Sequence, residues 1–149
     1  MSDRSEISLP VVVDTSASPN ASLCPVPLGA VRLRDRFWEP RRRINREVTL
    51  PSQWRHCEET GRIDNFRRAA GKIEAQFRGR YYNDSDVYKW VEACAYSLVE
   101  GPDPDLERML EEVIREIADA QGPDGYLNTY FTVELAGERW SNLKDKHEL

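Results

Sequence analysis

The stretch Asp84-Ser85-Asp86-Val87-Tyr88-Lys89-Trp90-Val91-Glu92-Ala93 carries the strongest structural signal in this chain. From Ser85 onward, apolar residues recur at the spacing i, i+3, i+4, i+7, i+8 and i+11, namely at Val87, Trp90, Val91, Cys94, Ala95 and Leu98. This spacing places them on one continuous face of an α-helix. We therefore predict an amphipathic helix from Ser85 that ends at Gly101-Pro102.

A second amphipathic helix follows directly. Asp103 precedes Pro104, and a side-chain oxygen at this position can cap a helix that begins with proline. The apolar face comprises Leu106, Met109, Leu110, Val113, Ile114 and Ile117, and Gln121-Gly122-Pro123 ends the helix. Because only about three residues join the two helices, they must be antiparallel neighbours.

The N-terminal third of the sequence has weaker secondary-structure patterns. Residues 1–28 are rich in Ser, Pro, Asn and Asp without periodicity, and we predict a flexible leader there. Alternating apolar and charged residues over 31–35 predict a short strand. Glu39-Pro40 opens a helix that we expect to reach about residue 60, with a kink at Pro51 and a stop at Gly61.

Outside these helices we expect short elements only. Residues 65–70 are predicted to form one helical turn, 71–83 a loop, and 126–133 a short extended segment. The predicted fold class is therefore mainly α, an array of antiparallel helical hairpins with a short N-terminal strand and small extended insertions.

Composition narrows the class of protein. The 149 residues are 32% charged and 40% hydrophobic, which is typical of a soluble globular domain. A net charge of −5 gives no general attraction to nucleic acid, and no apolar run approaches the length of about 18 residues that a membrane span needs. We expect neither partner, and the cytoplasm is the expected location because residues 9–13 are too short for a signal-peptide core.

Asp84 and Asp86 allow two interpretations. Carboxylates accept strong hydrogen bonds and can bind sugar hydroxyls, and Tyr88 beside them could stack on a sugar ring. In the other interpretation, which spacing alone favours, Asp84 or Ser85 caps the helix and Asp86 is an acid in its first turn. Residues two apart at a helix start point in different directions, so the two aspartates do not form a catalytic pair.

Two further segments hold candidate binding residues. The turn after the second long helix presents Tyr126 and Asn128, and loops between rigid helices often carry function. His147, next to Glu148, could donate or accept a hydrogen bond. Turn chemistry and an ordinary surface histidine are the competing explanations.

Metal binding is not predicted. His56-Cys57-Glu58-Glu59 has the residue types of a metal site, but neighbours on a helix diverge by about 100° and cannot share one ion unaided. The three cysteines, Cys24, Cys57 and Cys94, are far apart and form no CxxC pair, so reduced thiols are expected.

Five short sequence segments, taken in their order along the chain, resemble a known family. They are Phe37-Trp38-Glu39-Pro40-Arg41, Asn65-Phe66 with Ala69-Ala70-Gly71, Asp84-Ser85-Asp86-Val87-Tyr88-Lys89-Trp90, Ala120-Gln121 with Asp124-Gly125-Tyr126-Leu127-Asn128-Thr129, and His147-Glu148-Leu149. Together, over about residues 29–149, they resemble glycoside hydrolase family 127, the β-L-arabinofuranosidase family once called a domain of unknown function.

The resemblance implies a fold and an activity. It implies an (α/α)6 toroid of which residues 29–149 would be a truncated N-terminal part, and a retaining hydrolase of terminal β-L-arabinofuranosyl groups. Family members use a zinc-held cysteine nucleophile and a glutamate acid/base, and the matched blocks contain none of these. We therefore expect no catalytic residue and no cofactor in this chain, which would be inactive alone although zinc belongs to the full-length family.

The resemblance also guides the choice of binding residues. His147 matches a histidine that reaches the sugar in the family, and Asp84 and Asp86 are expected near the same cleft. Tyr126 completes the expected substrate-binding residues, because the turn after the second long helix presents it. The expected partner is a carbohydrate that carries terminal L-arabinofuranose or a related sugar. The alternative function is a non-catalytic helical binding module whose apolar helix faces receive a partner.

Overall fold

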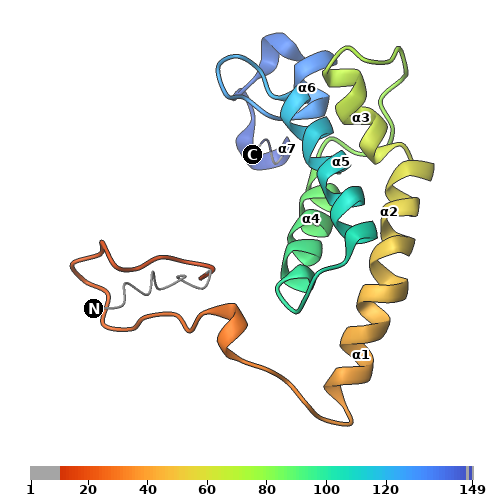
Figure 1. The fold of residues 1–149 in the computed structure, drawn as a ribbon. Coiled ribbons are helices and arrows are strands. Elements are labelled where there is room, and N and C mark those ends of the chain that lie inside the picture. Colours follow the sequence, from red (N-terminus) through yellow and green to blue (C-terminus); the bar gives the residue numbers. More distant parts are fainter. Residues whose placement is uncertain (1–10, 147, 149) are drawn as a thin grey trace, which may run out of the picture. The chain divides into compact units, whose positions relative to one another are not determined.

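The structure is a computed structural model that describes residues 11–146 and 148 (Figure 1). It divides into two units, one up to Arg42 and one from Arg43 onward. The first unit holds a 3-10 turn, η1 (Leu28–Ala30), and the start of α1 (Trp38–Ile44). Within it, Asp35 Oδ1 accepts hydrogen bonds from the amides of Phe37 at 2.7 Å and Trp38 at 2.5 Å, which satisfies N–H groups at the start of α1.

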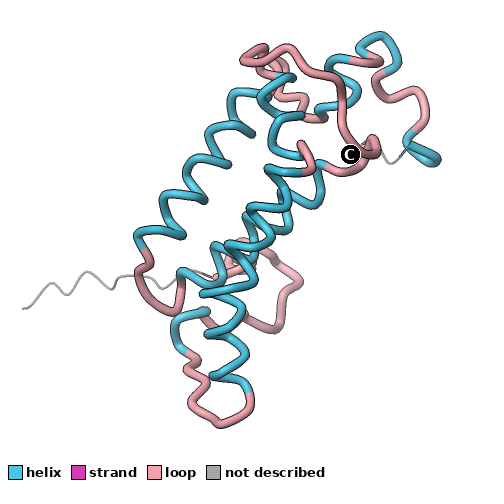
Figure 2. Tube along the Cα trace, turned by 90° about the vertical axis from the view of Figure 1, so that its right-hand side faces the viewer, coloured by secondary structure: helices cyan, strands magenta, loops and turns pink. Residues whose placement is uncertain are grey.

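The predicted strand over residues 31–35 is wrong, because the described part of the chain contains helices and loops only (Figure 2). Val31 does have an extended backbone, with φ −110° and ψ 124°. An alternating pattern becomes a strand only where a neighbouring strand takes up its backbone hydrogen bonds. No such neighbour exists among the described residues.

The long helix predicted from Pro40 to about residue 60 is confirmed, and its proline is accommodated by a π-turn. α1 is followed without a gap by η2 (Asn45–Thr49), which is π-helical, and then by α2 (Leu50–Glu59). The Leu50 N–H bonds to the Asn45 carbonyl, five residues back. Pro51 has no N–H to donate, and the wider π-turn immediately before it accommodates the missing backbone hydrogen bond.

Gly61 ends this helix as predicted, with a left-handed φ of +74°. A Cβ at this position would also displace the Arg78 side chain, but the positive φ is the main reason that the turn favours glycine. α3 (Arg62–Ala69) follows and is eight residues long, longer than the single turn predicted. The Asn65 side chain exchanges two hydrogen bonds with the Arg78 backbone, at 2.9 and 3.0 Å, and so fixes the predicted loop over 71–83 to α3.

The two long helices form the antiparallel hairpin that the periodicity predicted. α4 (Asp84–Leu98) and α5 (Pro104–Ala120) lie side by side (Figures 1 and 2). Asp103 caps α5, since its side chain accepts a hydrogen bond from the Leu106 amide at 3.1 Å. The predicted faces are wrong at two positions, because Ala95 and Ile114 are exposed. The buried core of the second unit comprises Leu50, Cys57, Ile63, Phe66, Val87, Trp90, Cys94, Leu106, Met109, Val113 and Ala120.

Two arginines connect the helices. Arg46, in the π-turn, donates to Asp103 Oδ2 at 2.9 Å and to the carbonyls of Ser97 at 3.3 Å and Gly101 at 2.6 Å, and so holds the connection between α4 and α5. Arg67 on α3 makes a two-pronged contact with Glu58 of α2 at 2.7 and 2.8 Å. It also reaches Glu116 of α5 at 3.4 Å, so one guanidinium joins three helices.

The segment predicted as extended over 126–133 is helical in its second half, where α6 (Thr129–Val133) forms. Asn128 Oδ1 accepts hydrogen bonds from the amides of Tyr130 and Phe131, which caps this short helix. Phe131 is fully buried, and α6 packs against α3. A 3-10 turn, η3 (Ala136–Glu138), and α7 (Leu143–Lys146) complete the described elements, none of which is long and apolar enough to cross a membrane.

Candidate functional site

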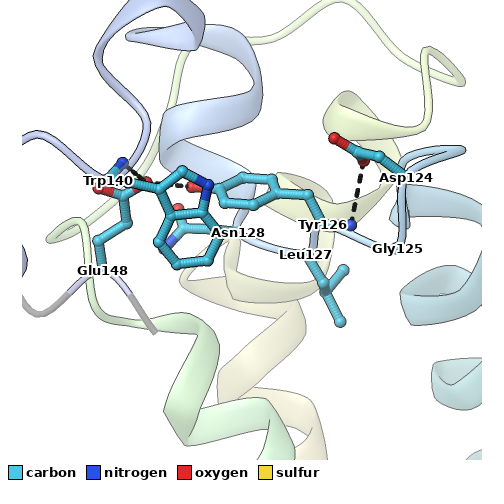
Figure 3. A pocket seen from close by; sticks show the side chains of 7 residues that line it. All are labelled: Asp124, Gly125, Tyr126, Leu127, Asn128, Trp140 and Glu148. Carbon is cyan, nitrogen blue, oxygen red and sulfur yellow. Dashed lines mark hydrogen bonds between the residues drawn. The ribbon is translucent and has the colours of Figure 1, made fainter.

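A pocket of about 420 Å³ lies beside the turn that follows α5 (Figure 3). The residues that line it are Asp124, Gly125, Tyr126, Leu127, Asn128, Trp140 and Glu148. The lining therefore combines two aromatic rings with acidic and amide side chains. Binding pockets for small polar molecules have this combination of flat apolar surfaces and a few placed hydrogen-bonding groups.

The turn itself positions Tyr126. The Gly122 N–H donates to the Tyr126 carbonyl at 2.8 Å, and Asp124 Oδ1 accepts from the Tyr126 amide at 3.1 Å. Gly125 has a φ of +84°, which only glycine adopts readily. The predicted turn at Asp124-Gly125 is thus confirmed, and it directs the Tyr126 ring toward Trp140 and Glu148 (Figure 3).

Glu148 is the most buried polar side chain of the pocket, with 0% of its surface exposed. Its Oε1 accepts a hydrogen bond from the Tyr126 hydroxyl at 2.6 Å, and both carboxylate oxygens lie 2.8 Å from the Trp140 amide nitrogen. A carboxylate can be buried at acceptable cost when several donors surround it. Glu148 therefore ties two distant segments of the pocket wall together.

The Tyr126 ring lies between an aromatic and a cationic neighbour. Its centroid is 5.1 Å from that of Trp140 in an edge-to-face pair, and the Arg139 guanidinium lies 4.0 Å above its face. Burial, followed by the hydrogen bond to Glu148, raises the pKa of the Tyr126 hydroxyl above its ordinary value. The hydroxyl is therefore a neutral donor at physiological pH.

Asp84 is bonded to Thr129, the residue that follows Asn128 of the pocket wall. It is 7% exposed, and its two oxygens accept hydrogen bonds from the Thr129 amide at 2.7 Å and the Thr129 hydroxyl at 2.6 Å. Burial raises the pKa of Asp84, while the two bonds from Thr129 oppose that rise. The residue before α4 is Asn83, whose side chain makes no capping bond, so the prediction that Asp84 or Ser85 caps the helix is wrong.

Asp86 is an acid in the first turn of α4, as predicted, and pairs with Arg62 at 2.7 Å. It does not line the pocket, whereas Tyr126 does. Asp84 is linked to Tyr126 only indirectly, because its hydrogen bonds go to Thr129, three residues after Tyr126. His147 lies outside the described residues. The sequence did not predict a role for Trp140, because the residues around it show no periodic pattern or motif. It also did not predict a role for Glu148, which was noted only as the neighbour of His147.

The three cysteines are free thiols, and two of them are buried. Burial raises the pKa of Cys57, and it raises that of Cys94 to about 12, which is the opposite of what a thiolate needs. Cys24 is exposed and belongs to the first unit. Within the described residues, no three His, Cys, Asp or Glu side chains gather in a way that could hold a metal ion.

The described residues form a mainly α-helical fold with a polar and aromatic pocket, and comparisons with known proteins give the family. Residues 30–149 match the family model described as beta-L-arabinofuranosidase, GH127 catalytic domain. Since this match spans most of the chain, the protein belongs to glycoside hydrolase family 127. The resemblance inferred from the five sequence blocks is thereby confirmed.

Individual relatives agree with the family match. The chain is 30% identical over 142 residues to a non-reducing end beta-L-arabinofuranosidase from Bifidobacterium longum subsp. longum, covering 80% of this chain and 22% of that protein. A solved GH127 beta-L-arabinofuranosidase from Geobacillus stearothermophilus T6 shares 44% identity at a TM-score of 0.75, over 79% of this chain and 20% of that one. A second solved GH127 beta-arabinofuranosidase shares 41% identity at a TM-score of 0.74, over 83% and 21%. The chain thus spans about a fifth of the length of the relatives it matches.

Proposed function

We propose that residues 29–149 form a sugar-binding part of a GH127 catalytic toroid, and that the sugar is a terminal β-L-arabinofuranosyl group. The pocket beside Tyr126 carries this proposal. Its aromatic rings provide flat surfaces and its polar side chains a few hydrogen-bonding groups, which is the combination that pockets for small polar molecules have. The names of the relatives support the choice of sugar.

The proposal assigns a role to each predicted site residue. Tyr126 lines the pocket directly. The proposed sugar contact of His147, which lies outside the described residues, rests on the family resemblance alone. Asp84 acts mainly through Thr129, because both of its oxygens are already engaged there. Asp86 is half-buried, pairs with Arg62 and lies outside the pocket lining, so we assign it an indirect role in sugar binding.

We further propose that the chain does not hydrolyse glycosides by itself. The two thiols of the core have raised pKa values and are buried, which supports their being structural. A retaining mechanism also needs two catalytic groups about 5 Å apart on either side of the scissile bond. The carboxylates of the pocket wall, Glu148 and Asp124, are engaged instead with the backbone and with Tyr126.

The test has two arms. Purified chain is incubated with an aryl β-L-arabinofuranoside, and release of the aryl group above that of heat-denatured protein would refute the claim of inactivity. Binding is measured separately by calorimetry with methyl β-L-arabinofuranoside, with methyl α-L-arabinofuranoside as the control. Binding of the β-anomer that is lost in Tyr126→Ala supports the proposal, and equal binding of both anomers or none of either refutes it.

The alternative of a non-catalytic helical binding module gives a different outcome. In that case the exposed apolar side chains on the helices, such as Ile114 and Tyr96, would form a binding surface for a partner. In a piece of a larger toroid, such side chains would instead be surface left uncovered by the missing helices. Sedimentation and binding of an apolar dye distinguish the two. A compact monomer that binds neither dye nor sugar would favour the module.

A further inference from the structure

Trp140 has an unusual backbone conformation. It is the non-glycine residue with positive φ among the described residues, at +65°. A bulky side chain in this left-handed region is unfavourable and persists only when the surroundings hold it there. Glu148 supplies that hold, since both of its carboxylate oxygens lie 2.8 Å from the Trp140 amide nitrogen.

This conformation does not serve to bury the indole. Trp140 is 60% exposed, although it lines the pocket. Trp90 shows the usual arrangement of a core tryptophan, since it is 3% exposed and its indole N–H donates to the Leu50 carbonyl at 2.9 Å. A strained backbone that presents an exposed ring is typical of a functional position, because it has no benefit for the core.

The ring is nevertheless held in place. Trp140 and Tyr126 form an edge-to-face pair with an interplanar angle of 86°, and the Tyr126 hydroxyl is bonded in turn to Glu148 (Figure 3). Such a pair can cover at most one face of the indole. Glu148 thus fixes both the backbone of Trp140 and the neighbour against which its ring rests.

We propose that Trp140 stacks on a sugar ring at the rim of the pocket and that Glu148 is the positioning residue that presents it. This inference rests on the sugar-binding role proposed above and adds a residue to it. Sugar rings have faces of C–H groups that pack on a flat indole, while their hydroxyls need polar partners at the edge. Asn128 provides such a partner, because its oxygen caps α6 and its NH₂ group carries two donors.

The experiment uses the ¹⁵N-labelled chain titrated with methyl β-L-arabinofuranoside. Each of the four tryptophans gives one indole N–H signal, and Trp140→Phe and Trp38→Phe assign two of them. We expect the Trp140 signal to shift on titration. Trp140→Ala should raise Kd about tenfold or more, whereas Trp140→Phe, which keeps an aromatic face, should stay within about threefold of the wild type.

Trp38 provides the matched control. It is 53% exposed, similar to Trp140, but lies in α1 with ordinary helical geometry. Trp38→Ala should leave Kd and the Trp140 signal unchanged. The positioning role of Glu148 is tested by Glu148→Gln, which should shift the Trp140 amide resonance and raise Kd while the helix signals of α4 and α5 stay in place.

The outcomes separate the two proposals. If the wild type binds the sugar and Trp140→Ala binds it equally well, the stacking role is overturned while the proposed function survives. If the wild type binds no β-anomer at any concentration, both are overturned. If Glu148→Gln moves the Trp140 amide signal but leaves Kd unchanged, the positioning role of Glu148 is overturned.

Discussion

Asp84 offers the sharpest test of how the pocket wall is held. Its carboxylate accepts two hydrogen bonds from Thr129, which lies 45 residues further along the chain. Asp84→Ala leaves the buried Thr129 amide without an acceptor, at a cost of about 1–3 kcal/mol, and removes a hydroxyl–carboxylate bond worth about 1.5 kcal/mol. Relief of the cost of burying the carboxylate offsets part of this, so we expect a net loss of about 2–3 kcal/mol.

Asp84→Asn should behave differently. The amide oxygen can accept from the Thr129 amide, and the Thr129 hydroxyl can rotate to accept from the new NH₂ group. We therefore expect its free energy of unfolding to stay within about 1 kcal/mol of the wild type at neutral pH.

The pH dependence of the pair follows from the raised pKa of Asp84. Because burial lifts the folded-state pKa above the ordinary value of 3.8, the folded protein binds a proton that the unfolded chain has already released. The stabilising contribution of Asp84 is complete below 3.8 and is lost as pH rises through the folded-state pKa. The stability of the wild type relative to Asp84→Asn should therefore fall over this window.

The assay is urea unfolding followed by far-ultraviolet circular dichroism from about pH 3.5 to about pH 7. Thr129→Val serves as the matched control, because it removes the hydroxyl donor and keeps the amide. An Asp84→Ala variant within about 0.5 kcal/mol of the wild type would refute the reasoning. If the difference in free energy of unfolding between wild type and Asp84→Asn does not change with pH, the argument from the raised pKa of Asp84 is refuted.

Other predictions concern the helix connections. Arg46→Lys keeps the charge but loses the forked contact with the α4–α5 connection, so urea unfolding should show a loss of about 1–2 kcal/mol. Arg67→Met leaves the Glu58 carboxylate without its two-pronged partner and should cost about 3 kcal/mol in the same assay. Arg108→Ala, whose exposed ion pair is worth little, should change stability by less than about 0.5 kcal/mol. Trp90→Phe loses a buried hydrogen bond, and thermal unfolding should show a loss of about 1–2 kcal/mol.

The helical hairpin was predictable because its signals are local. The i, i+3, i+4 spacing, the cap at Asp103 and the stop at Gly61 each act within one or two turns of chain. The errors arise where neighbours distant in sequence decide. Ala95 and Ile114 fit the pattern but face solvent. Residues 129–133 form a helix that packs against α3 and buries Phe131, a contact that the local sequence does not show.

By itself, the sequence determined the mainly α class, the antiparallel hairpin and the family, because periodicity and ordered blocks can be read without knowing any contact. Only the tertiary structure decided how the pocket is built. The hydrogen bonds that Asp84 accepts from Thr129, and that Glu148 accepts from Tyr126 and Trp140, connect segments too far apart in sequence to leave a periodic pattern. Trp140 is the clearest case, since its exposed ring and positive φ depend on one buried carboxylate that no local pattern identifies.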